Sequence, residues 1–295
     1  MTIRIDAHQH FWRYRIEDYP WIASDMTILA NDRLPDSLQA ILQTNTIQAT
    51  IAVQARADSQ ETGFLLALAQ DTPWIAGVVG WEDLCADDLV ERLASWQHPK
   101  LLGWRHQVQD EPDVPGFLAR PDFNRGVALV QQLGYVYDVL VTQQQLPQIP
   151  AFCARHDQHW LVLDHLGKPA LREFDAPETV HHWRQHLQTL AAMPHVVCKL
   201  SGLVTEADWR AGLQTQDLSH IRLCLDLALA AFGPQRLMFG SDWPVCLLAA
   251  SYADVAQLVT QWSRDNLHPD EQAALWGGTA ARCYGMTDFT DSIPG

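Results

Sequence analysis

The stretch IRIDAHQH, residues 3–10, sets the expectation for the fold. Successive side chains of a β-strand point to opposite faces. Asp6, His8 and His10 therefore share one face, and the apolar residues of the stretch share the other. If the apolar face packs on helices, the polar face points into a barrel, and the two histidines lie near the carboxyl end of the strand, where barrel enzymes hold their sites.

Seven further runs rich in Val, Ile and Leu follow this stretch. They begin near Thr50, Gly77, Leu101, Tyr135, Trp160, Val196 and Leu237. The mean spacing is about 33 residues, close to the roughly 31 residues of one strand–helix unit in a (β/α)₈ barrel. The spacing predicts eight parallel strands that alternate with helical segments.

Helical periodicity fills the intervals between these runs. The predicted helices include residues 35–44, 178–190, 217–232, 252–265 and 270–284, and Asp36 or Ser37 is expected to cap the first. A doubly wound sheet would also alternate strands and helices, but no glycine-rich phosphate turn follows the first strand. The fold class is therefore α/β, with residues 1–295 forming a single (β/α)₈ barrel domain and residues 287–295 a short tail.

Composition narrows the class of protein. Of 295 residues, 47% are hydrophobic and 19% charged, as in globular proteins, and no apolar run is long enough to cross a membrane. The net charge of −15 disfavours nucleic acid and anionic membranes as partners, but it does not hinder a small neutral molecule. Six cysteines without a C-x-x-C pair, in a chain without an export signal, predict reduced thiols and a cytoplasmic location.

Two strands end in residues suited to acid–base chemistry. The eighth run ends in FGSDWP, and its Asp242 is placed to act as a general base. An N-cap of the next helix is the alternative role for this carboxylate. The sixth run ends in LDHLGKP. His165 shares a face with Leu161 and Leu163, so we expect it to point inward as a second catalytic residue.

Other polar residues near strand ends are candidates to bind a substrate. They are Arg105, His106, Lys199, Trp243 and Gln54. Lys199 can face inward or extend its ammonium outward to solvent. The tryptophan can line an aromatic wall for a sugar ring or pack beneath loops.

The motifs DAHQHFW, GWRH, LDHLGKP, KLSGL and FGSDWP together resemble the amidohydrolase superfamily. More narrowly, they are similar to its metal-dispensable lactonase branch, which includes sugar-acid lactonases and pyrone-dicarboxylate lactonase. The resemblance extends through WGGTAARCYG at residues 276–285. It implies a (β/α)₈ barrel with His8 and His10 on the first strand, His165 on the sixth and Asp242 on the eighth.

Two departures from the metal-dependent members bear on cofactors. Those members generally carry a bridging Lys or Glu at the end of strand four and a His at the end of strand five. This chain has Arg105 and His106 at the first place and Tyr137 and Asp138 at the second. We therefore expect no required cofactor. One zinc or other divalent ion, bound by His8, His10 and Asp242, stays open.

The resemblance implies hydrolysis of a sugar-acid lactone, such as L-fucono-, L-rhamnono- or galactonolactone, with Asp242 as general base. Three alternatives stay open: a metal-dependent decarboxylase of the same superfamily, an amide or deaminating hydrolase, and a non-catalytic sugar-binding barrel. The expected partner is a small-molecule lactone, and a homo-oligomer is compatible with the sequence.

Overall fold

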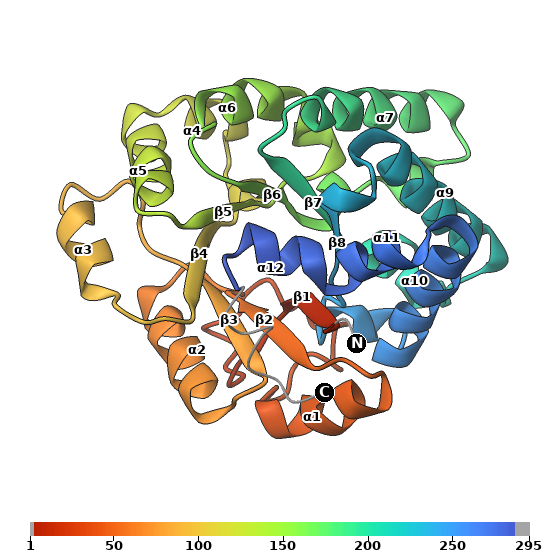
Figure 1. The fold of residues 1–295 in the computed structure, drawn as a ribbon, viewed down its shortest axis with the longest axis horizontal. Coiled ribbons are helices and arrows are strands. Elements are labelled where there is room, and N and C mark those ends of the chain that lie inside the picture. The colour runs from red at the N-terminus through yellow and green to blue at the C-terminus, as the bar shows by residue number, and fades with distance from the viewer. Residues whose placement is uncertain (1–2, 287–295) are drawn as a thin grey trace.

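Eight parallel strands form the centre of the computed structural model, which describes residues 3–286 (Figure 1). They are β1 (Ile5–Gln9), β2 (Ala49–Val53), β3 (Ile75–Gly80), β4 (Leu101–His106), β5 (Val136–Val139), β6 (Leu161–Leu163), β7 (Val196–Leu200) and β8 (Leu237–Phe239). Each strand pairs with the next in sequence order. Backbone bonds from His10 N to Trp243 O (2.7 Å) and from Asp242 N to His8 O (2.8 Å) join the segment after β8 to β1. The predicted (β/α)₈ barrel is confirmed.

Helices surround the strands, except for α12, which lies across the ring (Figure 1). They are α1 (Pro35–Thr44), α2 (Ser59–Asp71), α3 (Leu89–Ser95), α4 (Val114–Ala119), α5 (Pro121–Gln132), α6 (Ile149–Arg155), α7 (Pro177–Ala191), α8 (Leu203–Glu206), α9 (Thr215–Phe232), α10 (Tyr252–Asn266), α11 (Pro269–Ala273) and α12 (Thr279–Cys283). Among the described residues, no helix has the length and apolar character needed to span a bilayer. All six cysteines are free thiols, as predicted.

Alternate apolar side chains of the strands fall into two of the three apolar clusters of the described residues. Cys198 and Leu200 of β7 pack with the helices, whereas Val197 lies in a second cluster enclosed by the strands. Ile3, just before β1, and Ala280 of α12 belong to this inner cluster. Figure 1 shows α12 across the middle of the ring. Helix α12 therefore closes the amino-terminal end of the barrel and leaves the carboxyl ends of the strands free to form a pocket.

Two details differ from the predicted elements. No side chain caps α1: Leu34 is its N-cap, and Ser37 instead donates its hydroxyl to the Leu34 carbonyl (2.6 Å). Pro35 begins the helix because its fixed φ already suits the first turn. The helix predicted over 270–284 is interrupted by a π-helical turn, Ala274–Gly278. At this turn a Cβ on Gly277 would lie 2.1 Å from the Ile3 carbonyl oxygen. The predicted tail, 287–295, lies outside the described residues.

Candidate active site

A pocket of about 120 Å³ opens at the carboxyl ends of the strands. Its wall includes His10 after β1, Arg105 on β4, His165 and Lys168 after β6, and Asp242 after β8. Barrel enzymes hold their catalytic groups at this end of the strands. The pocket thus brings together ionisable side chains that are more than 200 positions apart in the chain.

Asp242 lies at the centre of three imidazoles. Its Oδ1 is 3.2 Å from His10 Nε2, 3.8 Å from His8 Nε2 and 4.0 Å from His165 Nε2. Burial by itself would raise the pKa of Asp242, but the imidazoles, His165 first, hold that pKa below the ordinary carboxyl range. The carboxylate is therefore ionised at neutral pH and able to accept a proton.

His8 and His10 point into the barrel for a different reason from the one predicted. Ile5 and Ala7 belong to the inner apolar cluster. Asp6 faces the helices, where Tyr252 of α10 donates its hydroxyl to Asp6 Oδ2 (3.0 Å). The register of β1 against β2 shifts between Asp6 and Gln9. A bulge of this kind re-aims the side chains that follow it, and so it turns the two histidines inward after an inward Ala7.

The hydrogen bonds of His10 define which ring nitrogen carries the hydrogen. Nδ1 lies 2.7 Å from the Val53 carbonyl oxygen, which can only accept, so Nδ1 is the donor. In the neutral ring, Nε2 then presents a lone pair to Asp242 Oδ1, which is also an acceptor. A shared proton or a cation between the two atoms relieves this opposition. His8, His10 and Asp242 together offer three ligand atoms within 4.8 Å of one another, and these residues fit a single divalent ion.

A left-handed turn presents His165 to the pocket. His165 (φ 52°), Leu166 (φ 54°), Gly167 (φ 69°) and Lys168 (φ 47°) all have positive φ. Each non-glycine residue in this conformation costs about 1–2 kcal/mol. The predicted strand parity was wrong, because Leu161 and Leu163 face the helices. The turn, and not the strand, directs His165 inward.

Ser201 and Gly202 of the loop after β7 hold the His165 ring from behind. His165 Nδ1 lies 2.8 Å from Ser201 Oγ. Gly202 has φ 69°, and a Cβ there would lie 2.5 Å from His165 Nδ1. Burial lowers the pKa of His165 to about 4. The ring is therefore neutral at pH 7, and its Nε2 faces the pocket.

A buried ion network lies beneath these imidazoles. Lys199 Nζ contacts Asp138 Oδ2 (2.5 Å) and Asp164 Oδ1 (3.1 Å). Arg105 donates to Asp164 Oδ2 (2.9 Å), and His8 Nδ1 lies 3.3 Å from Asp164 Oδ1. Burial opposes charge in the network, but the two acids raise the pKa of Lys199, and Lys199 and His8 hold the pKa of Asp164 well below its usual range. Asp164 is therefore ionised between two permanent cations.

Four predicted substrate-binding residues do not line the pocket. His106 stacks on Phe117 (ring centroids 4.7 Å apart), because it lies on the opposite face of β4 from Arg105. Trp243 is 1% exposed and packs in the apolar cluster against the helices. Gln54 donates to the Arg105 carbonyl (3.0 Å), and Lys199 is fully buried. Of the five predicted residues, Arg105 alone lines the pocket. Lys199 faces inward, which is one of the two orientations that the sequence left open.

Sequence reasoning missed Asp164, Ser201 and Lys168. Asp164 stands directly before His165, on the same side of β6 as the inward Val162. Strand parity counted from Val162 would have found it. No local signal marked Lys168 or Ser201, because a left-handed turn and a separate loop bring them to the site.

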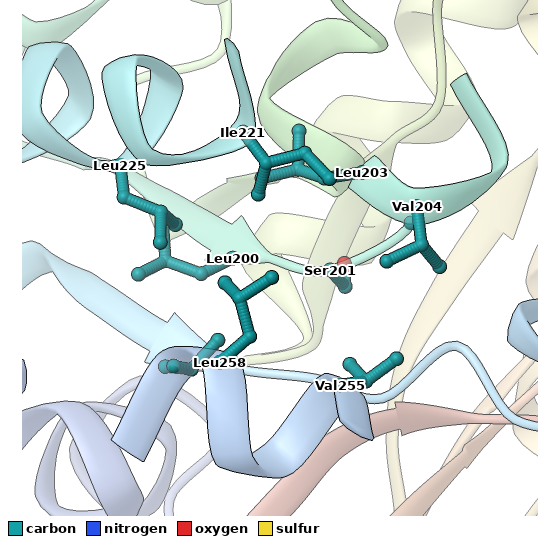
Figure 2. A pocket seen from close by; sticks show the side chains of 10 residues that line it. Leu200, Ser201, Leu203, Val204, Ile221, Leu225, Val255 and Leu258 are labelled. Carbon is teal, nitrogen blue, oxygen red and sulfur yellow. The ribbon is translucent and has the colours of Figure 1, made fainter. Parts of the chain in front are cut away.

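A second cavity lies behind the site and is apolar (Figure 2). Leu200, Val204, Ile221, Leu225 and Val255 are among the side chains around it. Its volume of about 20 Å³ accommodates about one water molecule. This cavity is too small and too apolar for a polar substrate. It therefore does not compete with the polar pocket as the place of chemistry.

Comparison with known proteins links this geometry to a family. The family model described as amidohydrolase matches residues 5–286. The chain is 62% identical over 292 residues to the L-fucono-1,5-lactonase of Burkholderia multivorans, with 99% of each chain covered. It is 34% identical over 288 residues to the L-fucono-1,5-lactonase of Burkholderia ambifaria, with 96% of each chain covered.

The fold also matches a crystal structure of an amidohydrolase from Burkholderia multivorans with bound zinc. The TM-score is 0.94 and the sequence identity 64%, with 96% of this chain and 99% of the other covered. The zinc ion is bound in the crystal structure of that relative.

Proposed function

The chain belongs to the amidohydrolase family, and on this premise we propose that it hydrolyses the lactone ring of a sugar acid. The resemblance predicted from the motifs is confirmed. The enzyme is a hydrolase of a cyclic ester, and L-fucono-1,5-lactone is the substrate we infer from the two Burkholderia relatives. The observation that carries the proposal is the ionised Asp242 carboxylate facing three imidazoles in a polar pocket.

Asp242 is the general base in this proposal. Its carboxylate takes a proton from a water molecule as the water oxygen forms a bond to the lactone carbonyl carbon. The carbonyl π electrons move onto its oxygen, and the oxyanion accepts hydrogen bonds from His165 Nε2 and Arg105. Both side chains line the pocket together with Asp242.

Ring opening follows from the same carboxyl group. The carbonyl re-forms as the bond to the ring oxygen breaks, and protonated Asp242 returns its proton to that oxygen. The products are one hydroxyl and one carboxylic acid, and the acid ionises at neutral pH. Turnover therefore releases one proton for each ring opened.

The buried ion network positions the histidines in this proposal. His8 Nδ1 lies 3.2 Å from Lys199 Nζ and 3.3 Å from Asp164 Oδ1, so the network holds this edge of the ring. His8 Nε2 on the opposite edge is then directed toward Asp242 Oδ1 (3.8 Å). The pKa of His8 is lowered well below its ordinary value, chiefly by burial, which keeps the ring neutral. A neutral ring leaves Asp242 free to act as the base.

One divalent ion fits the site, held by His8, His10 and Asp242. Such an ion, when bound, supplies a Lewis acid beside the lactone carbonyl. A second group of three residues, His8, Asp164 and His165, shares His8 with the first. Both oxygens of its Asp164 already face Lys199 or Arg105, so a second ion is disfavoured. We therefore propose that no metal is required and that at most one binds.

The expected partner is the lactone itself. The net charge of −15 argues against nucleic acid and anionic membranes as further partners. A homo-oligomer, a cytoplasmic location and a single domain over 1–295 stay predictions.

The decisive experiment is a panel of aldonolactones followed with a pH indicator. We expect L-fucono-1,5-lactone to be among the best substrates, with spontaneous hydrolysis in buffer as the blank. Release of CO₂ from a hydroxybenzoic acid, with no lactone opened, would favour the decarboxylase. Binding of sugar acids without turnover of any lactone would favour the sugar-binding barrel.

A further inference from the structure

The left-handed turn after β6 does more than orient His165. The Lys168 backbone N–H donates to the His165 carbonyl (2.8 Å), which closes a turn of three residues. In such a turn, side chains three positions apart lie on the same side. His165 and Lys168 accordingly both line the pocket. The strained backbone therefore delivers a lysine together with the imidazole.

The Lys168 backbone is held in place from two sides. Besides its own N–H bond, its carbonyl accepts from the backbone N–H of Gln143 (3.2 Å). Pro169 follows and fixes the exit of the chain. The position of Lys168 beside the pocket is thus a property of the folded backbone.

The ammonium of Lys168 differs from the other two in the chain. Lys199 pairs with Asp138 and Asp164, and Lys100 donates to the Ala69 carbonyl (2.6 Å). Among residues 3–286, the Lys168 ammonium makes neither an ion pair nor a hydrogen bond. Its three hydrogens are available to a ligand with oxygen acceptors.

The depth of Lys168 indicates which part of a ligand it meets. His165 and Asp242 are 4% and 5% exposed, whereas Lys168 is half-buried and thus nearer the mouth. A lactone whose carbonyl carbon lies beside Asp242 directs the rest of its sugar toward that mouth. The pocket wall there also carries the amides of Gln107 and Gln109.

We propose that Lys168 is a specificity-determining residue that donates a hydrogen bond to a hydroxyl of the sugar lactone. The inference rests on the proposed lactonase function and adds the group that selects a hydroxylated ring. A charged donor to one hydroxyl favours the natural substrate over its deoxy analogue by about 10- to 100-fold. Because the contact is remote from the reacting carbonyl, it acts on KM more than on kcat.

The test compares the wild type with Lys168→Met on the best aldonolactone and on its mono-deoxy analogues. We expect KM to rise about 10- to 100-fold with kcat nearly unchanged. For one deoxy analogue, the wild type should show a lower kcat/KM than for the parent lactone. Lys168→Met should show the same kcat/KM for both compounds. Lys168→Arg should keep most of the discrimination, and Lys168→Gln serves as the second neutral variant if the Met variant does not fold.

Lys100→Met is the matched control, since it removes a lysine that contacts only backbone carbonyls away from the pocket. It should leave selectivity unchanged. If the wild type turns over a lactone but Lys168→Met has unaltered selectivity, or loses only kcat, the proposed role of Lys168 is overturned. The proposed lactonase function would then still stand. Absence of turnover by the wild type on every lactone would overturn the proposed function as well.

Discussion

At the scale of single residues, environment decides what each ionisable group can do. The chain has several acids near strand ends, but their surroundings give them different states. Asp242 is buried among imidazoles that lower its pKa. Asp138, also buried, has its pKa raised to about 6, chiefly by burial and against the charge of Lys199. Position in the sequence does not distinguish these carboxylates, but their contacts do.

Asp242→Asn should abolish most of the turnover and leave the fold intact. The amide is nearly isosteric with the carboxylate but cannot accept a proton from water. We expect kcat to fall about 10⁴-fold, the upper end for a general base, because the same group also serves the leaving oxygen. Steady-state kinetics measures kcat, and competition by the product measures affinity, which should be retained.

Asp175→Asn is the control, because that side chain is 83% exposed and lies outside the pocket. Its kcat should equal that of the wild type. A near-normal kcat in Asp242→Asn on a confirmed lactone substrate would refute the assignment of the base.

At the scale of elements, loops after the strands build the site. The strands supply Arg105 and His8, but His165, Lys168, Ser201 and Asp242 come from the segments that follow them. Positive φ at His165, Lys168 and Asp242 shows that backbone conformation aims these side chains. Strain of this kind persists only where surrounding contacts impose it, and it concentrates at functional sites.

Gly202→Ala should damage both stability and catalysis. Its φ of 69° disfavours any side chain, and the new Cβ would lie 2.5 Å from His165 Nδ1. We expect a loss of about 1–3 kcal/mol in the free energy of unfolding, together with a lower kcat because the His165 ring must move. Denaturant unfolding and steady-state kinetics measure the two effects.

Gly212→Ala is the control that introduces backbone strain without a steric clash. Gly212 also has positive φ (73°), but a Cβ there would meet no atom within 4 Å. This variant should lose about 1 kcal/mol of stability and keep its kcat. Equal kcat in the two alanine variants would show that Gly202 does not position His165.

At the scale of the whole molecule, barrel closure brings buried charges of opposite sign together. Asp164, Asp138, Arg105 and Lys199 come from four different segments and are all fully or almost fully buried. Removing one member of such a network leaves an uncompensated buried charge, which is strongly destabilising. The two cations also stand beside Asp164, where a second metal ion would need a free carboxylate.

Removal of metal should therefore leave much of the lactonase activity. A lactone needs less activation than an amide, because an alkoxide is the better leaving group. Elemental analysis of the purified protein should find no more than one zinc per chain. After dialysis against a chelator, the pH-indicator assay should still measure a substantial kcat. Two ions per chain, with activity abolished by their removal, would contradict this expectation.

Acid should destabilise the fold in part through His156. Burial lowers the pKa of His156 to about 4, and its Nε2 lies 2.9 Å from Asn124 Oδ1. Between about pH 6.5 and 4 the unfolded chain binds a proton that the folded chain excludes, so this contribution to stability falls as the pH falls. His156→Gln should show a weaker loss of unfolding free energy over that window in denaturant titrations. Parallel pH curves for the two proteins would contradict it.

The order and number of the strands could be predicted from the amino-acid pattern alone. The eight predicted apolar runs began within two residues of the observed strands, because burial on both faces of a parallel strand requires such runs. The pattern also placed Asp242, His165, His8, His10 and Arg105 at the correct end of the barrel. The ends of parallel strands are fixed by the direction of the chain, so this information is local.

The direction in which several site side chains point depends on contacts between distant parts of the chain. Alternation along β1 and β6 correctly predicted that the three histidines point inward. It also placed Asp6, Leu161 and Leu163 inward, whereas these residues face the helices. A register shift in β1 and a left-handed turn after β6 each rotate the chain by an amount that no alternation rule contains. The pairing of Lys199 with Asp138 and Asp164 likewise joins segments far apart in sequence. Such contacts depend on closure of the whole barrel. Burying a charge costs free energy, and this cost is offset only when the oppositely charged partner from a distant segment is present.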